Sequence, residues 1–214
     1  MTRFPIISAQ NLLILASASP RRKRLLTQAG IPFRSVTSKT SEKGITGAPA
    51  QISRVLAEKK AAHVYAETGA SWILGADTIV TVDNRILGKP EDSQKAREML
   101  LLLSGKEHRV ITGFCILDPS ATVAHSEAVT TLVRFKPLSG QEIEGYIGTG
   151  EPFGKAGSYA IQGMGSFMVE AINGSYTNVV GLPLCAVIKA LVSAGGLECF
   201  PLAKDLRQDN ARGH

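Results

Sequence analysis

Cysteine is scarce in this 214-residue sequence, and so are aromatic residues and long apolar runs. The cysteines are Cys115, Cys185 and Cys199, which are widely spaced and form no CxxC pair. That spacing supports neither a disulfide framework nor a zinc knuckle. The four histidines are equally scattered. A reduced, cytoplasmic protein is the simplest interpretation of this composition.

The shortness of the apolar runs argues against export and against a membrane anchor. Arg3 and the segment ISAQNLLILASAS faintly imitate a signal peptide, but the continuous apolar stretch covers only residues 12–16. That stretch is too short for the apolar region of a signal peptide and for the roughly 18 residues of a membrane span. We therefore expect neither export nor membrane insertion, and we interpret residues 12–16 as a buried strand.

The low aromatic content limits the kinds of partner that the charge of the chain suggests. A net charge of +6 and a pI of about 9.3 favour an anionic partner, and on charge alone nucleic acid, a nucleotide and an anionic lipid remain open. Aromatic residues make up only 6% of the chain and are not interleaved along a basic stripe. Nucleic acid is therefore not an expected partner, because base stacking needs such side chains.

Apolar periodicity and turn residues predict an α/β protein of one domain with a cleft. We expect that domain over residues 12–195, an N-terminal extension over 1–11 and a C-terminal tail over 196–214. The predicted strands are 12–16, 33–37, 72–82, 85–87, 107–117, 123–135 and 167–172. The predicted helices are 20–29, 51–68, 92–105, 139–148 and 182–194, and the segments 38–50 and 150–165 are predicted loops.

The segment LASASPRRKRLL places four consecutive basic residues at the start of a predicted helix. Ser19 suits the N-cap and Pro20 the first helical position. Positive charge there is unfavourable unless an anion is bound, so the segment is a candidate phosphate site, with Arg21 as its best candidate residue. The alternative is a solvated basic helix face. The segment lacks the glycines and the Lys-Ser/Thr ending of a P-loop.

Asp77 interrupts the otherwise apolar run over residues 72–82. A carboxylate in such a place is buried at a cost, paired with a cation or bound to a metal, unless it serves a turn or a cap. At a strand end that faces a phosphate site, it suits a magnesium ligand or a base that orients water.

Other polar residues are weaker candidates when each is taken alone. Lys89 and Lys155 lie in short Gly- and Pro-containing turns, from which a lysine can reach a phosphate, although most loop lysines are only solvated. Helical periodicity does not decide whether Lys59 or Lys60 faces the interior. The amide of Gln162 could read a base edge or equally satisfy loop backbone.

Several blocks together resemble the Maf family of nucleoside triphosphate pyrophosphatases. They are LASASPRR, GADTIV followed by ILGKP, LSGKEHRVITG, and GEPFGKAGSYAIQGMG followed by GSYTNVVGLPL, spread over residues 12–194. The resemblance implies an elongated Maf/ITPase-like domain, with a mixed twisted sheet flanked by helices and a deep substrate cleft. It also implies hydrolysis between the α and β phosphates that needs Mg²⁺ or Mn²⁺, and a homodimer.

The resemblance assigns roles to individual residues. Asp77 is similar to the proton acceptor, and Glu42 and Asp77 are similar to the metal ligands. The positions that set substrate choice correspond to Arg21, Thr78 and Gln162. The phosphate-binding positions correspond to Ser17, Lys60, Lys89 and Lys155.

Within that family, SPRR, GADT and YAIQG are similar to the subgroup that acts on dTTP and UTP. The subgroup that acts on 7-methyl-GTP has Trp after Ser-Pro and Asp-Gln in place of Asp-Thr, and this sequence has neither. A second enzymatic possibility is action on modified or purine triphosphates. The alternative from another class is a non-catalytic regulator of cell division that senses nucleotides or binds nucleic acid.

Overall fold

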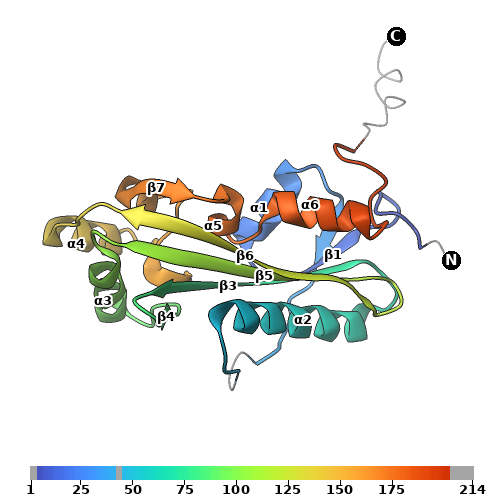
Figure 1. The fold of residues 1–214 in the computed structure, drawn as a ribbon, viewed down its shortest axis with the longest axis horizontal. Coiled ribbons are helices and arrows are strands. Elements are labelled where there is room, and N and C mark those ends of the chain that lie inside the picture. The colour runs from blue at the N-terminus through green and yellow to red at the C-terminus, as the bar shows by residue number, and fades with distance from the viewer. Residues whose placement is uncertain (1–3, 42–44, 203–214) are drawn as a thin grey trace, which may run out of the picture.

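A long sheet runs through the molecule, with helices on both of its faces (Figure 1). The computed structural model describes residues 4–41 and 45–202. Within these residues the strand order is β2-β1-β3-β5-β6-β7, and β4 pairs with β3. The strands are β1 (Leu13–Ala16), β2 (Phe33–Ser35), β3 (Ile73–Val82), β4 (Arg85–Leu87), β5 (Glu107–Leu117), β6 (Val123–Phe135) and β7 (Val169–Asn173).

The sheet is mixed, as predicted. Strand β1 runs parallel to both β2 and β3, whereas the pairs β3–β4, β3–β5, β5–β6 and β6–β7 are antiparallel. Leu13 and Leu15 of β1 belong to one apolar cluster, and Ile14 and Ala16 belong to another. Since successive side chains of a strand point to opposite faces, β1 is covered on both sides, which explains its unbroken apolar sequence.

The helices divide between the two faces of the sheet. They are α1 (Pro20–Gln28), α2 (Pro49–Thr68), α3 (Ser93–Leu103), α4 (Gly140–Gly148), α5 (Tyr176–Val180) and α6 (Leu184–Ser193), with 3₁₀ turns η1 (Ala156–Ser158) and η2 (Met164–Met168). Helix α2 covers one face, α1, α5 and α6 lie over the other, and α3 and α4 lie at the far end of the elongated molecule (Figure 1).

Helix α2 lies directly on the backbone of the sheet. A Cβ atom on Gly75 of β3 would lie 2.1 Å from the carbonyl oxygen of Ala57, and one on Gly113 of β5 would lie 2.3 Å from the carbonyl carbon of Ser53. Only glycine leaves room for this approach. Because Gly113 pairs with Asp77 across the two strands, the close contact occurs beside the candidate catalytic carboxylate.

Most element boundaries match the predicted ones, and the differences have local causes. Ser19 caps α1 and Pro20 begins it, as expected. Helix α2 starts at Pro49, two residues earlier than predicted, because proline suits the first helical turn. The expected strand 167–172 is instead the turn η2 followed by β7. The short helix α5, capped by Ser175, was not predicted.

The N-terminal segment packs on the same core as the sheet. The backbone N–H of Ile7 donates to the carbonyl of Gly196 at 2.8 Å, and the indole N–H of Trp72 donates to the carbonyl of Pro5 at 2.9 Å. The ring of Phe4 meets Trp72 edge to face. Residues from both ends of the described chain therefore enclose Trp72. Among the described residues, no helix combines the length and apolarity that a membrane crossing would require.

Candidate active site

A cleft of about 830 Å³ opens between the end of β1, the helix α2, the strand β3 and the segment 154–162. Every predicted site residue that the structure describes lines it. These residues are Ser17, Arg21, Lys60, Asp77, Thr78, Lys89, Lys155 and Gln162. Glu42 lies outside the described residues. The predicted deep cleft is therefore present, and it gathers side chains from five separate parts of the sequence.

The turn between β1 and α1 forms one wall of the cleft. The hydroxyl of Ser35 donates to the carbonyl of Ser17 at 2.7 Å, and the backbone N–H of Ser19 donates to the hydroxyl of Ser17 at 3.2 Å. Ser19 in turn caps α1 by accepting from the N–H of Arg22. These bonds hold the N-terminus of α1 at the cleft, where its partial positive charge favours an anion.

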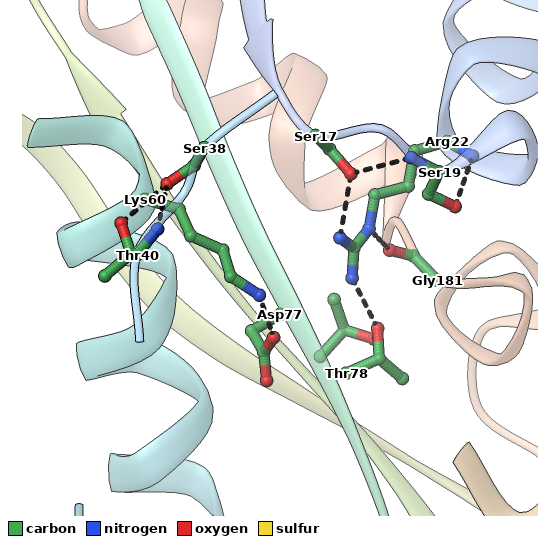
Figure 2. A network of polar contacts seen from close by, with 10 residues as sticks. Ser17, Ser19, Arg22, Ser38, Thr40, Lys60, Asp77, Thr78 and Gly181 are labelled. Atoms are coloured by element: carbon green, nitrogen blue, oxygen red, sulfur yellow. Dashed lines mark hydrogen bonds and ion pairs between the residues drawn. The ribbon is translucent and has the colours of Figure 1, made fainter. Parts of the chain in front are cut away.

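Arg22 is the functional candidate that sequence reasoning missed in favour of Arg21. Its guanidinium is buried and donates to Gly181 O at 2.7 Å, Ser17 Oγ at 3.2 Å and Thr78 Oγ1 at 3.0 Å (Figure 2). It thus ties α1 to the residue that follows β1, to β3 and to the turn before α6. The sequence SPRR did contain a signal for Arg22. Consecutive residues of a helix point in different directions, so Arg21 and Arg22 were bound to have different surroundings.

The Thr78 hydroxyl is held in one orientation by its neighbours. It accepts from Arg22, and it lies 3.0 Å from the hydroxyl of Thr112, which donates to the carbonyl of Asn178 at 3.1 Å. Since Thr112 has only one hydroxyl proton, Thr78 must donate to Thr112. The Thr78 hydroxyl therefore has no proton left for a ligand. Its remaining lone pair can accept a hydrogen bond from one.

Asp77 is paired with Lys60 inside the cleft. The ammonium of Lys60 lies 2.6 Å from Asp77 Oδ1, and the two side chains are 13% and 12% exposed. Of the alternatives for a buried carboxylate, pairing with a cation is thus observed. Lys59 is exposed, so the structure settles which lysine of α2 faces inward. The second carboxylate oxygen, Oδ2, lies on the side away from Lys60 (Figure 2).

Arg21 and Lys155 bring two positive charges together at the cleft. Burial lowers the pKa of the Arg21 guanidinium below its ordinary value. Burial also lowers the pKa of Lys155, and the positive charge of Arg21 lowers it further. The Lys155 ammonium donates to the carbonyls of Glu151 and Phe153. A bound anion would relieve the mutual repulsion of these two cations.

Lys89 and Gln162 lie at the exposed rim of the cleft. The Lys89 turn is joined to the Lys155 segment, since the N–H of Gly157 donates to the carbonyl of Gly88 at 3.1 Å. A methyl group at Gly157 would lie 2.9 Å from Val80 Cγ1, so glycine permits this close approach. Lys89 and Lys155 are 66 positions apart in the sequence, but their turns lie side by side and form one wall of the cleft.

Metal ligands are few on this surface. Among the described residues, Asp77 is the sole carboxylate that lines the cleft, and no group of three or more His, Cys, Asp or Glu side chains could hold a metal ion. Mg²⁺ is commonly bound by one or two carboxylates together with substrate phosphates and water. Among the described residues this donor set fits an ion shared with a phosphate ligand, for which Asp77 Oδ2 would be the protein ligand.

The fold and the cleft define an α/β protein that binds a phosphorylated small ligand beside one buried carboxylate. A family model described as Maf-like protein matches residues 12–194, and the chain belongs to this family.

Many curated relatives and solved structures are similar to this chain, among them the following two relatives and one structure. A dTTP/UTP pyrophosphatase of Syntrophotalea carbinolica is 50% identical over 191 residues, which cover 88% of this chain and 87% of the relative. One of Geotalea uraniireducens is 47% identical over 194 residues, covering 90% and 100%. The solved structure is a nucleoside-triphosphatase / dITP/XTP pyrophosphatase of Mycobacterium abscessus, with 16% identity and a TM-score of 0.39 over 59% of this chain and 74% of that one.

Proposed function

We propose that this protein hydrolyses dTTP and UTP to the nucleoside monophosphate and pyrophosphate. The observation that carries the proposal is the cleft, which brings Asp77 together with Arg21 and the lysines at 60, 89 and 155. The names of relatives that are about half identical over nearly the whole chain support the substrates. The carboxylate among cations and those relatives do not favour the alternative of a non-catalytic regulator.

The proposed reaction is direct attack of water on the α-phosphorus. A bond forms between the water oxygen and phosphorus while the bond to the bridging oxygen breaks, and pyrophosphate leaves with the electron pair. Asp77 accepts the proton of the water. Arg21 and the lysines stabilise the negative charge that develops on the leaving group. Lys60 holds Asp77 in place through the contact of 2.6 Å.

The proposed cofactor is Mg²⁺ or Mn²⁺, held by Asp77 and, as the family resemblance implies, by Glu42. Such an ion supplies neutralisation of phosphate charge when it is bound. The chain itself orients the triphosphate through the β1–α1 turn, where Ser17 is fixed by Arg22.

Thr78, Gln162 and Arg21 are the proposed specificity residues. Thr78 can only accept a hydrogen bond, for the reason given above, whereas the Gln162 amide can both donate and accept. Together they suit an edge such as that of uracil or thymine, which presents one N–H between two carbonyls. The cytoplasmic location and the homodimer stay predictions, and both removal of unwanted nucleotides and control of cell division are compatible with this hydrolysis.

The test is a panel assay with dTTP, UTP, CTP, GTP, ATP and 7-methyl-GTP in Mg²⁺ or Mn²⁺, with pyrophosphate and orthophosphate detected separately. We expect pyrophosphate from dTTP and UTP, and a loss of at least about 100-fold in kcat for Asp77→Asn, as for removal of a general base. Asp83→Asn is the matched control, because Asp83 is exposed and pairs with Lys106 outside the cleft. Near-normal turnover by Asp77→Asn would contradict the base role.

A further inference from the structure

Glu151, a carboxylate outside the cleft, anchors one of the cleft walls. It follows α4 and is half-buried. Its Oε1 atom accepts from the hydroxyl of Tyr146 at 2.8 Å and from the N–H of Gly165 at 2.9 Å, while Oε2 accepts from the N–H of Met164 at 3.1 Å. Burial raises the pKa of Glu151, but the hydrogen bonds outweigh it and leave the pKa below its ordinary value.

Two glycines make room for this carboxylate and its tyrosine partner. A Cβ atom on Gly163 would lie 2.2 Å from Glu151 Oε2, and one on Gly165 would lie 2.7 Å from the Tyr146 hydroxyl. The glycines on either side of Met164 are therefore needed for space as well as for backbone flexibility. They let the carboxylate reach the backbone directly.

Tyr146 extends the anchor to a third point on the wall. Its hydroxyl donates to Glu151 and accepts from the backbone N–H of Ala160 at 3.1 Å. The backbone carbonyl of Glu151 also accepts from the ammonium of Lys155. One residue and its tyrosine partner thus contact the wall near Lys155, at Ala160 and just beyond Gln162.

This wall has little regular structure of its own. Between α4 and η2, the described segment contains only the single turn η1. Segments without regular backbone hydrogen bonding depend on specific contacts for their shape. Gln162 itself is exposed, so its position in the cleft follows from the bonds made by its neighbours at 160, 164 and 165.

We propose that Glu151 is a positioning residue that fixes the wall formed by residues 154–162 and so governs how tightly and selectively the nucleotide is bound. It does so without lining the cleft. The inference rests on the proposed function, since it names the residue that holds the specificity position Gln162 and the phosphate-binding Lys155 in register with each other. Small displacements of binding groups are costly, because affinity depends on preorganised geometry.

The first experiment compares Glu151→Gln with the matched control Glu144→Gln. Glutamine has the size of glutamate but only one acceptor oxygen, so it cannot accept from Met164 and Gly165 at once. Glu144 lies on α4, is exposed and pairs with Arg97. We expect faster amide hydrogen exchange at Met164 and Gly165 in Glu151→Gln only. We also expect KM for dTTP to rise about tenfold, as for loss of one charge-assisted hydrogen bond, with a smaller change in kcat and a lower preference for dTTP over GTP.

The second experiment approaches the same contacts from Tyr146. Tyr146→Phe removes the bridging hydroxyl, and we expect effects on KM in the same direction, with the double variant less than additive because the residues share partners. This variant also decides the case if Glu151→Gln does not fold. The proposal is overturned if both variants lower the unfolding temperature but leave KM and substrate preference unchanged, or if their exchange at Met164 and Gly165 equals that of Glu144→Gln.

Failure of the proposed function gives a different pattern. If the wild-type protein hydrolyses no triphosphate, the proposed function is wrong, and the role of Glu151 is judged without turnover. Faster exchange together with weaker calorimetric binding of dTTP in EDTA then supports the positioning role, and unchanged exchange contradicts it.

Discussion

Arg21 and Arg22 are neighbours in sequence but lie in different surroundings. Arg21 lines the cleft close to Lys155, whereas Arg22 is buried and bonded to three segments of the chain. A planar guanidinium can bond in several directions at once, and an ammonium cannot match this geometry. At the scale of single residues, one arginine lies on the surface of the cleft and the next one organises the residues around it.

Lysine substitution should separate these two roles. Arg22→Lys should lower the free energy of unfolding by about 2 kcal/mol, because the acceptors on Gly181, Ser17 and Thr78 lose their shared donor. Arg21→Lys should change it by less than about 1 kcal/mol and mainly raise KM. Urea unfolding and steady-state kinetics of the two variants check this, and equal losses of stability would contradict it.

His108 gives the protein a sensitivity to acid. The ring is buried on β5, with Nε2 lying 2.8 Å from the Tyr159 hydroxyl, and Nδ1 has no hydrogen-bond partner among the described residues. Burial lowers the pKa of His108 from 6.5 to about 4. The unfolded chain therefore takes up this proton at a higher pH than the folded protein does. The contribution of the neutral His108 ring to the free energy of unfolding is therefore fully present above pH 6.5 and is lost as the pH falls towards 4.

The pH dependence of unfolding measures this contribution. The free energy of unfolding should fall by up to roughly 3 kcal/mol over that range in the wild type. His108→Gln, which keeps a polar partner for Tyr159, should show a much smaller decrease between pH 6.5 and 4.5. Urea unfolding at each pH measures these free energies. If the free energy of unfolding falls equally with pH in the two proteins, another group is responsible.

At the scale of elements, α2 decides the geometry of the Asp77–Lys60 pair. The helix rests on Gly75 and Gly113, so the spacing between helix and sheet is set by backbone atoms. Lys60 reaches Asp77 because no side chain separates α2 from β3 and β5 at these positions. The same contact brings Ser53 and Ala57 onto the sheet in the buried interior.

Gly113→Ala tests this contact. The added methyl group would lie 2.3 Å from Ser53 carbon and 2.4 Å from Arg54 nitrogen, so α2 must shift. We expect a loss of about 2 kcal/mol in unfolding free energy, as for an overpacked core, and a fall in kcat as Lys60 moves away from Asp77. Gly145→Ala in α4 is the control, since beyond its chain neighbours and its own helix backbone its methyl group would meet no described atom within 4 Å. Equal stability of the two variants would contradict the close contact.

Elements with strong local signals were predictable from sequence. Ser19 and Pro20 marked the start of α1, and the unbroken apolar run marked β1. Helix α5 was missed because five residues are too few to show helical periodicity. In the site, sequence reasoning selected Asp77 and Arg21 as candidates, and both line the cleft. It could not choose Lys60 over Lys59 without the family resemblance, and it could not see that Arg22 bonds to Gly181, because that contact spans 159 positions.

At the scale of the whole molecule, stability and chemistry are located at different places along the sheet. The N-terminal segment encloses Trp72 at the start of β3, whereas the candidate active site begins at Asp77 and continues towards β4. Ile7 is buried there and bonds to Gly196. This segment therefore acts on the stability of the fold and does not line the cleft.

Removal of residues 1–7 tests this division. The shortened chain should lose roughly 2–4 kcal/mol of unfolding free energy through exposure of apolar surface. Trp72 is the only tryptophan of the sequence, so its fluorescence should shift to longer wavelength in the folded shortened chain. The kcat for dTTP should stay within about twofold at a temperature where the chain is folded, as expected for sites that do not share partners. A large loss of kcat in the folded shortened chain would contradict the view that this segment acts on stability alone.

Two of the cleft walls, the one formed by α2 and the one formed by residues 154–162, differ in how much sequence change they tolerate. The α2 wall touches the sheet backbone to backbone, so a larger residue at the contact displaces the whole helix. The opposite wall is held by hydrogen bonds to Glu151 and Tyr146, and its exposed positions, such as Gln162, can change without disturbing a packed core. On this scaffold a change at Gln162 is therefore easier to accommodate than a change at the contact between α2 and the sheet, which keeps Lys60 beside Asp77.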